Sequence, residues 1–159
     1  TTTVDIQVAL ISTLAEQREL VSRALASAPG VVVGHAGADS RVWPAQAAWP
    51  DVAVFGLQEV PKPTRSADWW RDLAWLRKAA PQVRLCLWFQ SAEPEVIRAA
   101  SAAGVKGLVL WADATPTSWA AMVRVVNAGG SYWSRPFDVL GRWSREAVVV
   151  PAPADQGPL

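Results

Sequence analysis

The side chains best placed for chemistry are those at the ends of the apolar runs. Ser12 and Thr13 follow "IQVALI", Gly56 ends "DVAVFG", and Gln90 follows "RLCLWF". Hydroxyl and amide groups can orient a ligand by hydrogen bonding, but they do not supply the charged oxygens that a divalent cation requires. These residue types therefore favour binding over group transfer or metal-assisted catalysis.

Other combinations that support catalysis are missing from the sequence. His35 is the single histidine, so neither a Ser-His-Asp set nor an HExxH zinc motif can be assembled, and there is no Walker lysine motif. Cys86 stands alone inside "VRLCLW" and is expected to be a buried thiol. We expect no enzymatic activity, no cofactor and no resident metal.

The elements that position these residues are apolar runs of strand length that alternate with helical segments. Near-continuous hydrophobic strands are typical of a parallel sheet covered on both faces. The expected strands are residues 6–11, 31–36, 51–56, 84–89 and 107–111. This alternation predicts a doubly wound, flavodoxin-like α/β domain with a five-stranded parallel sheet of strand order 2-1-3-4-5. In such sheets, ligands bind beyond the carboxyl ends of the strands.

The segments between the strands predict regular helices over residues 15–28, 69–79, 94–103 and 116–128. The last two begin with proline, which is tolerated in a first helical turn, and Gly104 and Gly129 follow at positions typical of helix ends. Between the second and third strands, Pro44 limits the helix. We expect a short helix there that starts near Pro44 and ends before Pro50.

The composition is that of one globular domain. The chain has 159 residues, 51% of them hydrophobic, and 15 Lys and Arg residues nearly balance 14 Asp and Glu residues. A net charge of +1 gives no reason to expect DNA or membrane binding by this segment. No apolar run is long enough to span a membrane and no signal peptide is recognisable, so we expect a cytoplasmic protein. A domain over residues 1–137 and a Pro/Ala-rich linker or tail over residues 138–159 are expected.

The ordered strands, the loop "LQEVPKP" and the late segment "VVNAGGSYWSRP" together resemble the receiver domain of response regulators, particularly the NarL/LuxR class. The resemblance covers residues 5–136 and depends on the whole pattern. A receiver of that class has two acidic residues after the first strand, a phosphoacceptor aspartate ending the third, a Thr or Ser ending the fourth and a Lys ending the fifth. The residues at these positions here are Ser12, Thr13, Gly56, Trp88 and Trp111.

These replacements remove every group that aspartyl phosphorylation needs. Carboxylates hold Mg²⁺, one of them attacks the phosphoryl group, and the hydroxyl and the lysine hold the resulting anion. The two indoles offer one N–H donor each. The resemblance therefore implies an atypical receiver with a degenerate phosphorylation site. Leu108 stands where the class commonly has an aromatic switch residue, so that relay is also missing.

Trp88 and Trp111 make this site apolar, and the sequence leaves two main interpretations open besides a patch that docks another protein. In the first, the two rings collapse over Gly56 and fill the site. In the second, they line a pocket for a small, flat hydrophobic effector. The polar contacts of such a pocket would be Ser12, Thr13 and Gln90.

The resemblance implies a regulatory input and dimerisation domain that controls transcription without phosphorylation, through a ligand or a protein contact. DNA binding would belong to a C-terminal helix-turn-helix domain outside this segment. We expect a homodimer, with Leu108 and Trp119 on the face through which such receivers commonly dimerise. The alternative is a pseudo-receiver that acts as a targeting and dimerisation module of a pilus-assembly localisation ATPase.

Overall fold

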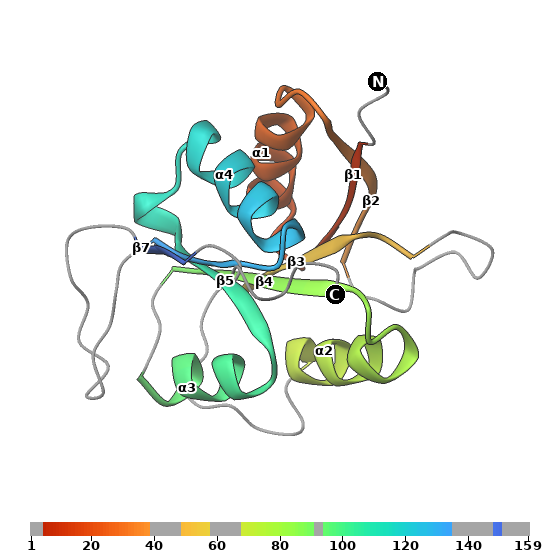
Figure 1. The fold of residues 1–159 in the computed structure, drawn as a ribbon, viewed down its shortest axis with the longest axis vertical. Helices are drawn as coiled ribbons and strands as arrows, with labels where there is room; N and C mark the ends of the chain where they lie inside the picture. The colour runs from red at the N-terminus through yellow and green to blue at the C-terminus, as the bar shows by residue number, and fades with distance from the viewer. Residues whose placement is uncertain (1–4, 39–48, 58–67, 91–93, 135–147, 151–159) are drawn as a thin grey trace, which may run out of the picture.

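A computed structural model of the chain describes residues 5–38, 49–57, 68–90, 94–134 and 148–150. In these ranges a central sheet is covered by helices on both faces (Figure 1). Helices α1 and α4 lie on one face, and α2 and α3 lie on the other. Their bounds are Ala15–Ala26 for α1, Asp68–Ala79 for α2, Pro94–Ala102 for α3 and Pro116–Asn127 for α4.

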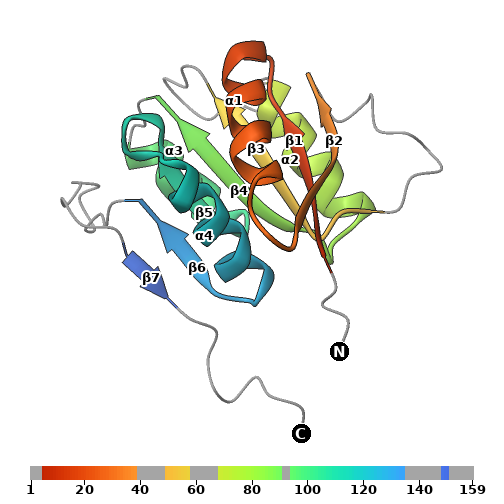
Figure 2. The ribbon, with the colours of Figure 1, turned by 90° about the horizontal axis from the view of Figure 1, so that it is seen from above.

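The sheet has the order β2-β1-β3-β4-β5-β6-β7 (Figure 2). Its first five members are parallel, so the predicted 2-1-3-4-5 order and the flavodoxin-like class are confirmed. The strands are β1 (Ile6–Ile11), β2 (Val31–Gly37), β3 (Val52–Leu57), β4 (Arg84–Phe89), β5 (Val105–Leu110), β6 (Ser131–Trp133) and β7 (Val148–Val150).

The two short strands β6 and β7 extend the predicted sheet beyond β5. β6 pairs parallel to β5, and β7 pairs antiparallel to β6. Each has three residues, too few to show a strand period in the sequence. β7 falls within residues 138–159, which were expected to be linker or tail, and the boundary of the domain stays a prediction.

The central strands are buried on both faces because each face carries its own apolar cluster. On the side of α1 and α4, the cluster includes Leu25, Trp88 and Met122. On the side of α2 and α3, it includes Phe55 and Ile97. This burial explains the near-continuous apolar runs from which the strands were predicted.

Local signals set the helix ends as expected. Gly104 and Gly129, which follow α3 and α4, have φ angles of +92° and +95°, a left-handed conformation that favours glycine. Helix α4 starts with a capping box, in which Thr115 Oγ1 accepts a hydrogen bond from the Ser118 N–H at 3.1 Å and Ser118 Oγ accepts one from the Thr115 N–H at 2.8 Å. The short helix expected near Pro44 lies outside the described residues.

The buried thiol of Cys86 provides a first test of the core. Cys86 is fully buried in β4, as predicted, and burial raises the pKa of its thiol strongly, with a smaller opposing effect from a hydrogen bond to the Gly107 backbone. Because the thiolate is the reactive form, we expect no labelling of the native protein by a thiol reagent such as DTNB at pH 8, and rapid labelling in urea. Labelling of the native chain at the rate of the unfolded chain would contradict this packing.

Candidate functional site

The parallel register brings the carboxyl ends of β1, β3 and β4 together. Gly56 pairs with Trp88 across β3 and β4, and Ile11 pairs with Phe55 across β1 and β3. Ser12 follows β1 directly, and its Oγ donates a hydrogen bond of 3.2 Å to the Gly56 carbonyl. Three residues that lie far apart in the sequence therefore meet at one edge of the sheet, as their positions at the strand ends predict.

The indole of Trp88 lies directly over Gly56. A Cβ atom added at Gly56 would be 2.1 Å from Cζ2 and 2.2 Å from Cε2 of Trp88, and 2.7 Å from Oγ of Ser12. Real Cβ atoms essentially never approach other atoms within 3.0 Å. Trp88 itself is 0% exposed. The space that a side chain at residue 56 would need is thus filled by the protein's own aromatic ring.

Helix α1 holds the indole of Trp88 through a residue that the sequence analysis did not single out. The Trp88 Nε1–H donates a hydrogen bond of 2.8 Å to Oε1 of Gln17. A buried indole N–H left without an acceptor is costly, so Gln17 satisfies the polar end of an otherwise apolar ring. The only sequence signal is that Gln17 lies in the first turn of the helix that follows Ser12.

The loop between β1 and α1 is held by its own hydrogen bonds. Ser12 Oγ accepts a hydrogen bond of 3.1 Å from the Leu14 N–H, and the Arg18 guanidinium donates to the Ser12 carbonyl oxygen. Ser12 is 3% exposed, whereas the side chain of Thr13 is exposed. Ser12 and Thr13 stand where the resemblance places two acidic residues. They differ in environment, because Ser12 is buried in the site and Thr13 faces solvent.

Three tryptophans, here called the tryptophan cluster, meet at this edge: Trp88, Trp111 and Trp119. The ring centroids of Trp88 and Trp119 are 5.6 Å apart with the planes at 83°, an edge-to-face contact. Trp111 lies 6.4 Å from Trp88 and 6.0 Å from Trp119, in both cases with tilted planes. These separations fall in the range of favourable aromatic pairs, which add about 0.5–1.5 kcal/mol each beyond the burial of area.

The remaining predicted site residues lie at the surface of this cluster or near it. Trp111 is half-buried in the short 3-10 helix η2 (Trp111–Asp113) that follows β5, so its ring covers Trp88 from one side. The side chain of Gln90 is exposed. Within the described ranges, no three His, Cys, Asp or Glu side chains gather where they could hold a metal ion.

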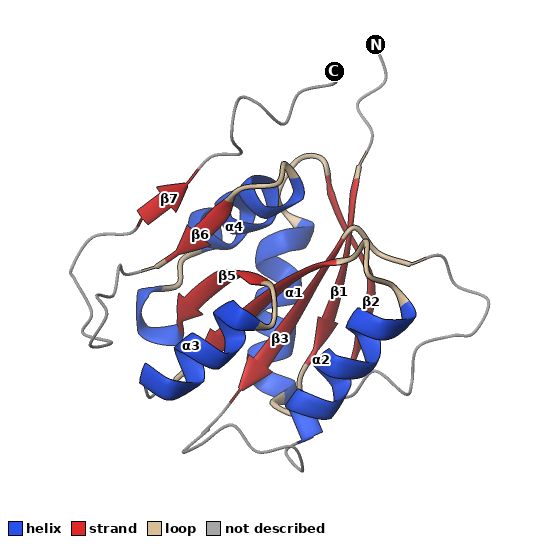
Figure 3. Cartoon of the chain, turned by 60° about the horizontal axis from the view of Figure 1, so that its bottom comes forward, coloured by secondary structure: helices blue, strands red, loops and turns tan. Residues whose placement is uncertain are grey.

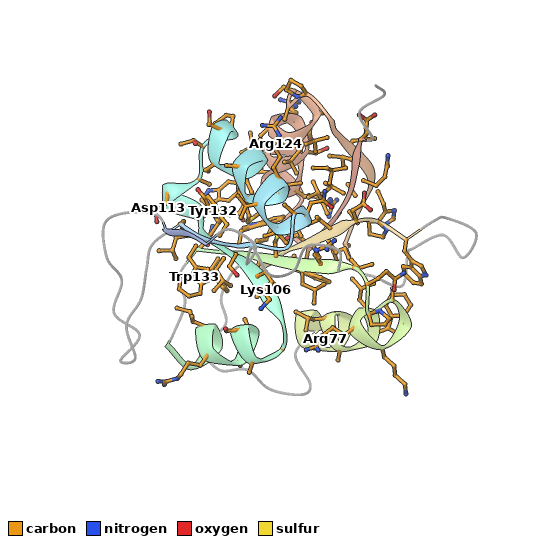
Figure 4. All side chains as sticks on the ribbon, in the orientation of Figure 1. Arg77, Lys106, Asp113, Arg124, Tyr132 and Trp133 are labelled. Carbon is orange, nitrogen blue, oxygen red and sulfur yellow. The ribbon has the colours of Figure 1, made fainter. Side chains whose placement is uncertain are left out.

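A small polar group lies beside the cluster, at the ends of β5 and β6. Figure 4 shows Asp113 and Tyr132 near one another. Ser134 Oγ lies 3.5 Å from a carboxylate oxygen of Asp113 and accepts a hydrogen bond of 2.8 Å from the Leu110 N–H. Burial raises the pKa of Tyr132, a side-chain hydrogen bond with Ser118 lowers it, and the charge of Asp113 raises it by a smaller amount. These contacts fix the turn into α4, which carries Trp119.

The expected dimer face needs a correction. Leu108 is 0% exposed and Trp119 is 4% exposed, so neither side chain can supply contact area to a second copy. Trp119 turns inward onto Trp88, and Leu108 packs in the opposite cluster, below α2 and α3. The outer edge of β5 is also paired with β6. The prediction that these two residues form a dimer surface is therefore wrong, whereas dimerisation itself stays a prediction.

Solved structures of response-regulator receiver domains share this fold. The chain is similar to the signal receiver domain of the putative response regulator NarL from Mycobacterium tuberculosis, with 22% identity over 79% of this chain and 98% of that one, and a TM-score of 0.62. A LuxR-family response regulator from Aurantimonas sp. SI85-9A1 is 20% identical over 79% of this chain and 86% of that one, with a TM-score of 0.63.

A third similar structure contains two RcsB dimers bound to two parallel DNAs. It is 15% identical over 79% of this chain and 62% of the RcsB chain, with a TM-score of 0.65. No protein-family model and no curated protein sequence matches the chain. At these identities the likeness establishes the receiver fold. None of the helices in the described ranges is long and apolar enough to span a membrane.

Proposed function

We propose that this chain is the regulatory input domain of a response regulator that controls transcription, and that it works without aspartyl phosphorylation. The observation that carries the proposal is the indole of Trp88, which fills the space over Gly56. In the receiver resemblance this is the place of the phosphoacceptor side chain. With an aromatic ring there, neither an aspartate nor a phosphoryl group has room.

The chemistry around that position supports the same proposal. Among the described residues, the groups that meet over β3 are a serine hydroxyl, a glycine and an indole, and none of these can act as an aspartyl phosphoacceptor. Arg18 lies near this position, and its guanidinium donates a hydrogen bond to the Ser12 carbonyl oxygen. The tryptophan cluster instead links the ends of β4 and β5 to α4 by direct ring contacts. We propose that this packing holds the domain in one conformation that is read by other proteins or domains.

The proposed partners rest on analogy with a similar structure. One similar structure is of RcsB dimers on DNA. By analogy, we propose that this domain acts in a homodimer in the cytoplasm, through a surface other than Leu108 and Trp119, and that DNA binding belongs to a separate domain. Neither the fold nor the similar structures favour the pilus-assembly ATPase.

The ligand-sensing version of the proposal meets a physical obstacle. A flat hydrophobic effector over Gly56 would have to displace the ring of Trp88, with its hydrogen bond to Gln17 and its contacts to two other indoles. The space expected for a ligand ring is occupied by the chain's own ring. Control by protein contact therefore fits the geometry better than control by a small molecule at this site.

Incubation with acetyl phosphate and Mg²⁺ tests the proposal. We expect the intact mass of the chain to stay unchanged after incubation and rapid quenching, because no carboxylate occupies the phosphoacceptor position. A receiver domain with an intact aspartate site, treated in parallel, serves as the positive control. Addition of one phosphoryl group, mapped by peptide mass spectrometry to an acidic residue of this chain, would contradict the proposal.

A further inference from the structure

A second surface of interest lies at the amino edge of the sheet, opposite the tryptophan cluster. Trp49 precedes β3, and Trp75 lies in the second half of α2, which runs back toward the start of the next parallel strand (Figure 3). The two indole rings form a tilted pair with centroids 5.8 Å apart. Trp49 is 36% exposed and Trp75 is 44% exposed. We call these two residues the indole pair.

The core of the domain does not require Trp75 to be a tryptophan. Helix α2 packs against the sheet through Leu73 and Leu76, each 1% exposed. Trp75 lies between them in sequence and therefore points away from that face. A large exposed indole at such a position contributes little to folding, whereas tryptophan is enriched among the residues that dominate binding energy at protein interfaces.

Exposed cations lie on the same part of the molecule. Lys78 follows Trp75 by one turn of α2, so the two side chains are neighbours on the helix surface. Arg84 and Lys106 are exposed near the starts of β4 and β5. Figure 4 shows Lys106 on the same side of the sheet as Arg77, which donates a hydrogen bond to the carbonyl of Ala103.

Among the residues whose side chains the structure describes, Asp51 is an acid near the indole pair, and it limits what can bind there. Asp51, two residues after Trp49, is exposed and accepts a hydrogen bond of 2.9 Å from the Gln7 N–H. A continuous phosphate backbone over Trp49 would meet this carboxylate. A peptide with a few carboxylates can place them against Lys78 and Arg84 and leave Asp51 opposite an uncharged position.

We propose that the indole pair and Lys78 form a docking surface for an acidic segment of a partner protein, in which an apolar side chain is flanked by carboxylates. The apolar side chain packs against the exposed surface that the two contacting indoles share, and the carboxylates pair with Lys78 and Arg84. The surface is separate from the site over Gly56, so the inference does not depend on the absence of phosphorylation there.

Selection from a random peptide display library tests the inference and does not require the partner to be identified first. The 159-residue chain is the bait, and a Trp49→Ser/Trp75→Ser variant is used for counter-selection. We expect the enriched peptides to carry net negative charge around an apolar residue. A synthetic copy of the best peptide should bind Trp75→Ser roughly 30-fold more weakly, the loss typical of an interface hot spot, and Lys78→Glu about 10-fold more weakly.

The matched control replaces an exposed apolar residue that lies away from the indole pair. Leu20 is 55% exposed in α1, on the other face of the sheet, so Leu20→Ser should bind the peptide as the parent chain does. Thermal melting checks that each variant is folded.

No enrichment, or enrichment of neutral or basic peptides, would overturn the proposal. Tighter binding of a single-stranded oligonucleotide that is lost in the double variant would assign the surface to nucleic acid. Loss of self-association in that variant by sedimentation would assign it to a second copy.

Discussion

Replacing Gly56 with alanine is expected to lower the free energy of unfolding by about 1–3 kcal/mol or more, the usual cost of overpacking a core. The new Cβ would start 2.1 Å from the Trp88 ring and 2.7 Å from Ser12 Oγ. The ring has little freedom to yield, because Trp88 is fully buried and its N–H is bonded to Gln17. Urea denaturation followed by circular dichroism measures the change.

Gly34→Ala is the matched control for this prediction. Gly34 lies in the edge strand β2, where an added Cβ would meet only the end of the flexible Gln7 side chain, at 3.3 Å. We expect a change within about 0.5 kcal/mol, as for most surface substitutions. If Gly56→Ala and Gly34→Ala changed stability equally, the Trp88 ring would not lie where the structure places it.

The double variant Gly56→Ala/Trp88→Ala tests whether residues 56 and 88 compete for the same space. Removing the indole opens the space that the Cβ at residue 56 needs, so the two changes should be less harmful together than the sum of their separate effects. The coupling would show that a side chain at residue 56 and an indole at residue 88 exclude one another. A glycine at residue 56 and a tryptophan at residue 88 would then depend on one another.

The sequence predicted the central sheet because its signal is local. Each of the first five strands is a near-continuous apolar run, and their alternation with helices predicts a parallel sheet, for which 2-1-3-4-5 is the usual order in a domain of this size. The predicted and observed strands differ slightly at their ends. The strand predicted over residues 107–111 is β5, which spans Val105–Leu110, and Trp111 begins η2 instead. β6 was missed because its pairing with β5 is a tertiary contact made by a three-residue segment.

The candidate site was predictable in position but not in side-chain geometry. The ends of parallel strands share one edge, so Ser12, Gly56 and Trp88 could be expected to meet. Whether the ring over Gly56 belongs to the protein or to a ligand depends on a side-chain orientation, which Gln17 helps to fix from another element. Trp119 was assigned to a surface because its helix borders the expected interface, but the structure turns it toward Trp88.

Replacing Trp88 with alanine is expected to lower the free energy of unfolding by about 3–5 kcal/mol, the usual cost of truncating a buried aromatic residue. Trp88 is 0% exposed and contacts the rings of both Trp111 and Trp119, so its removal leaves a cavity between β3 and α4 and ends both ring contacts. Chemical denaturation measures the stability. Trp88→Phe should cost less, since a ring remains and half-buried Gln17 can bond to water instead.

Trp75→Ala is the control that shows how much stability is lost when an exposed tryptophan, rather than a buried one, is removed. Trp75 is 44% exposed and lies outside the tryptophan cluster, so its removal should cost only a small fraction of the Trp88→Ala effect. Equal losses of stability in the two variants would mean that Trp88 does not hold the carboxyl edge of the sheet together. The expected difference would establish that Trp88, at the carboxyl edge of the sheet, serves as part of the core. Control of the domain would then have to act on surfaces outside it.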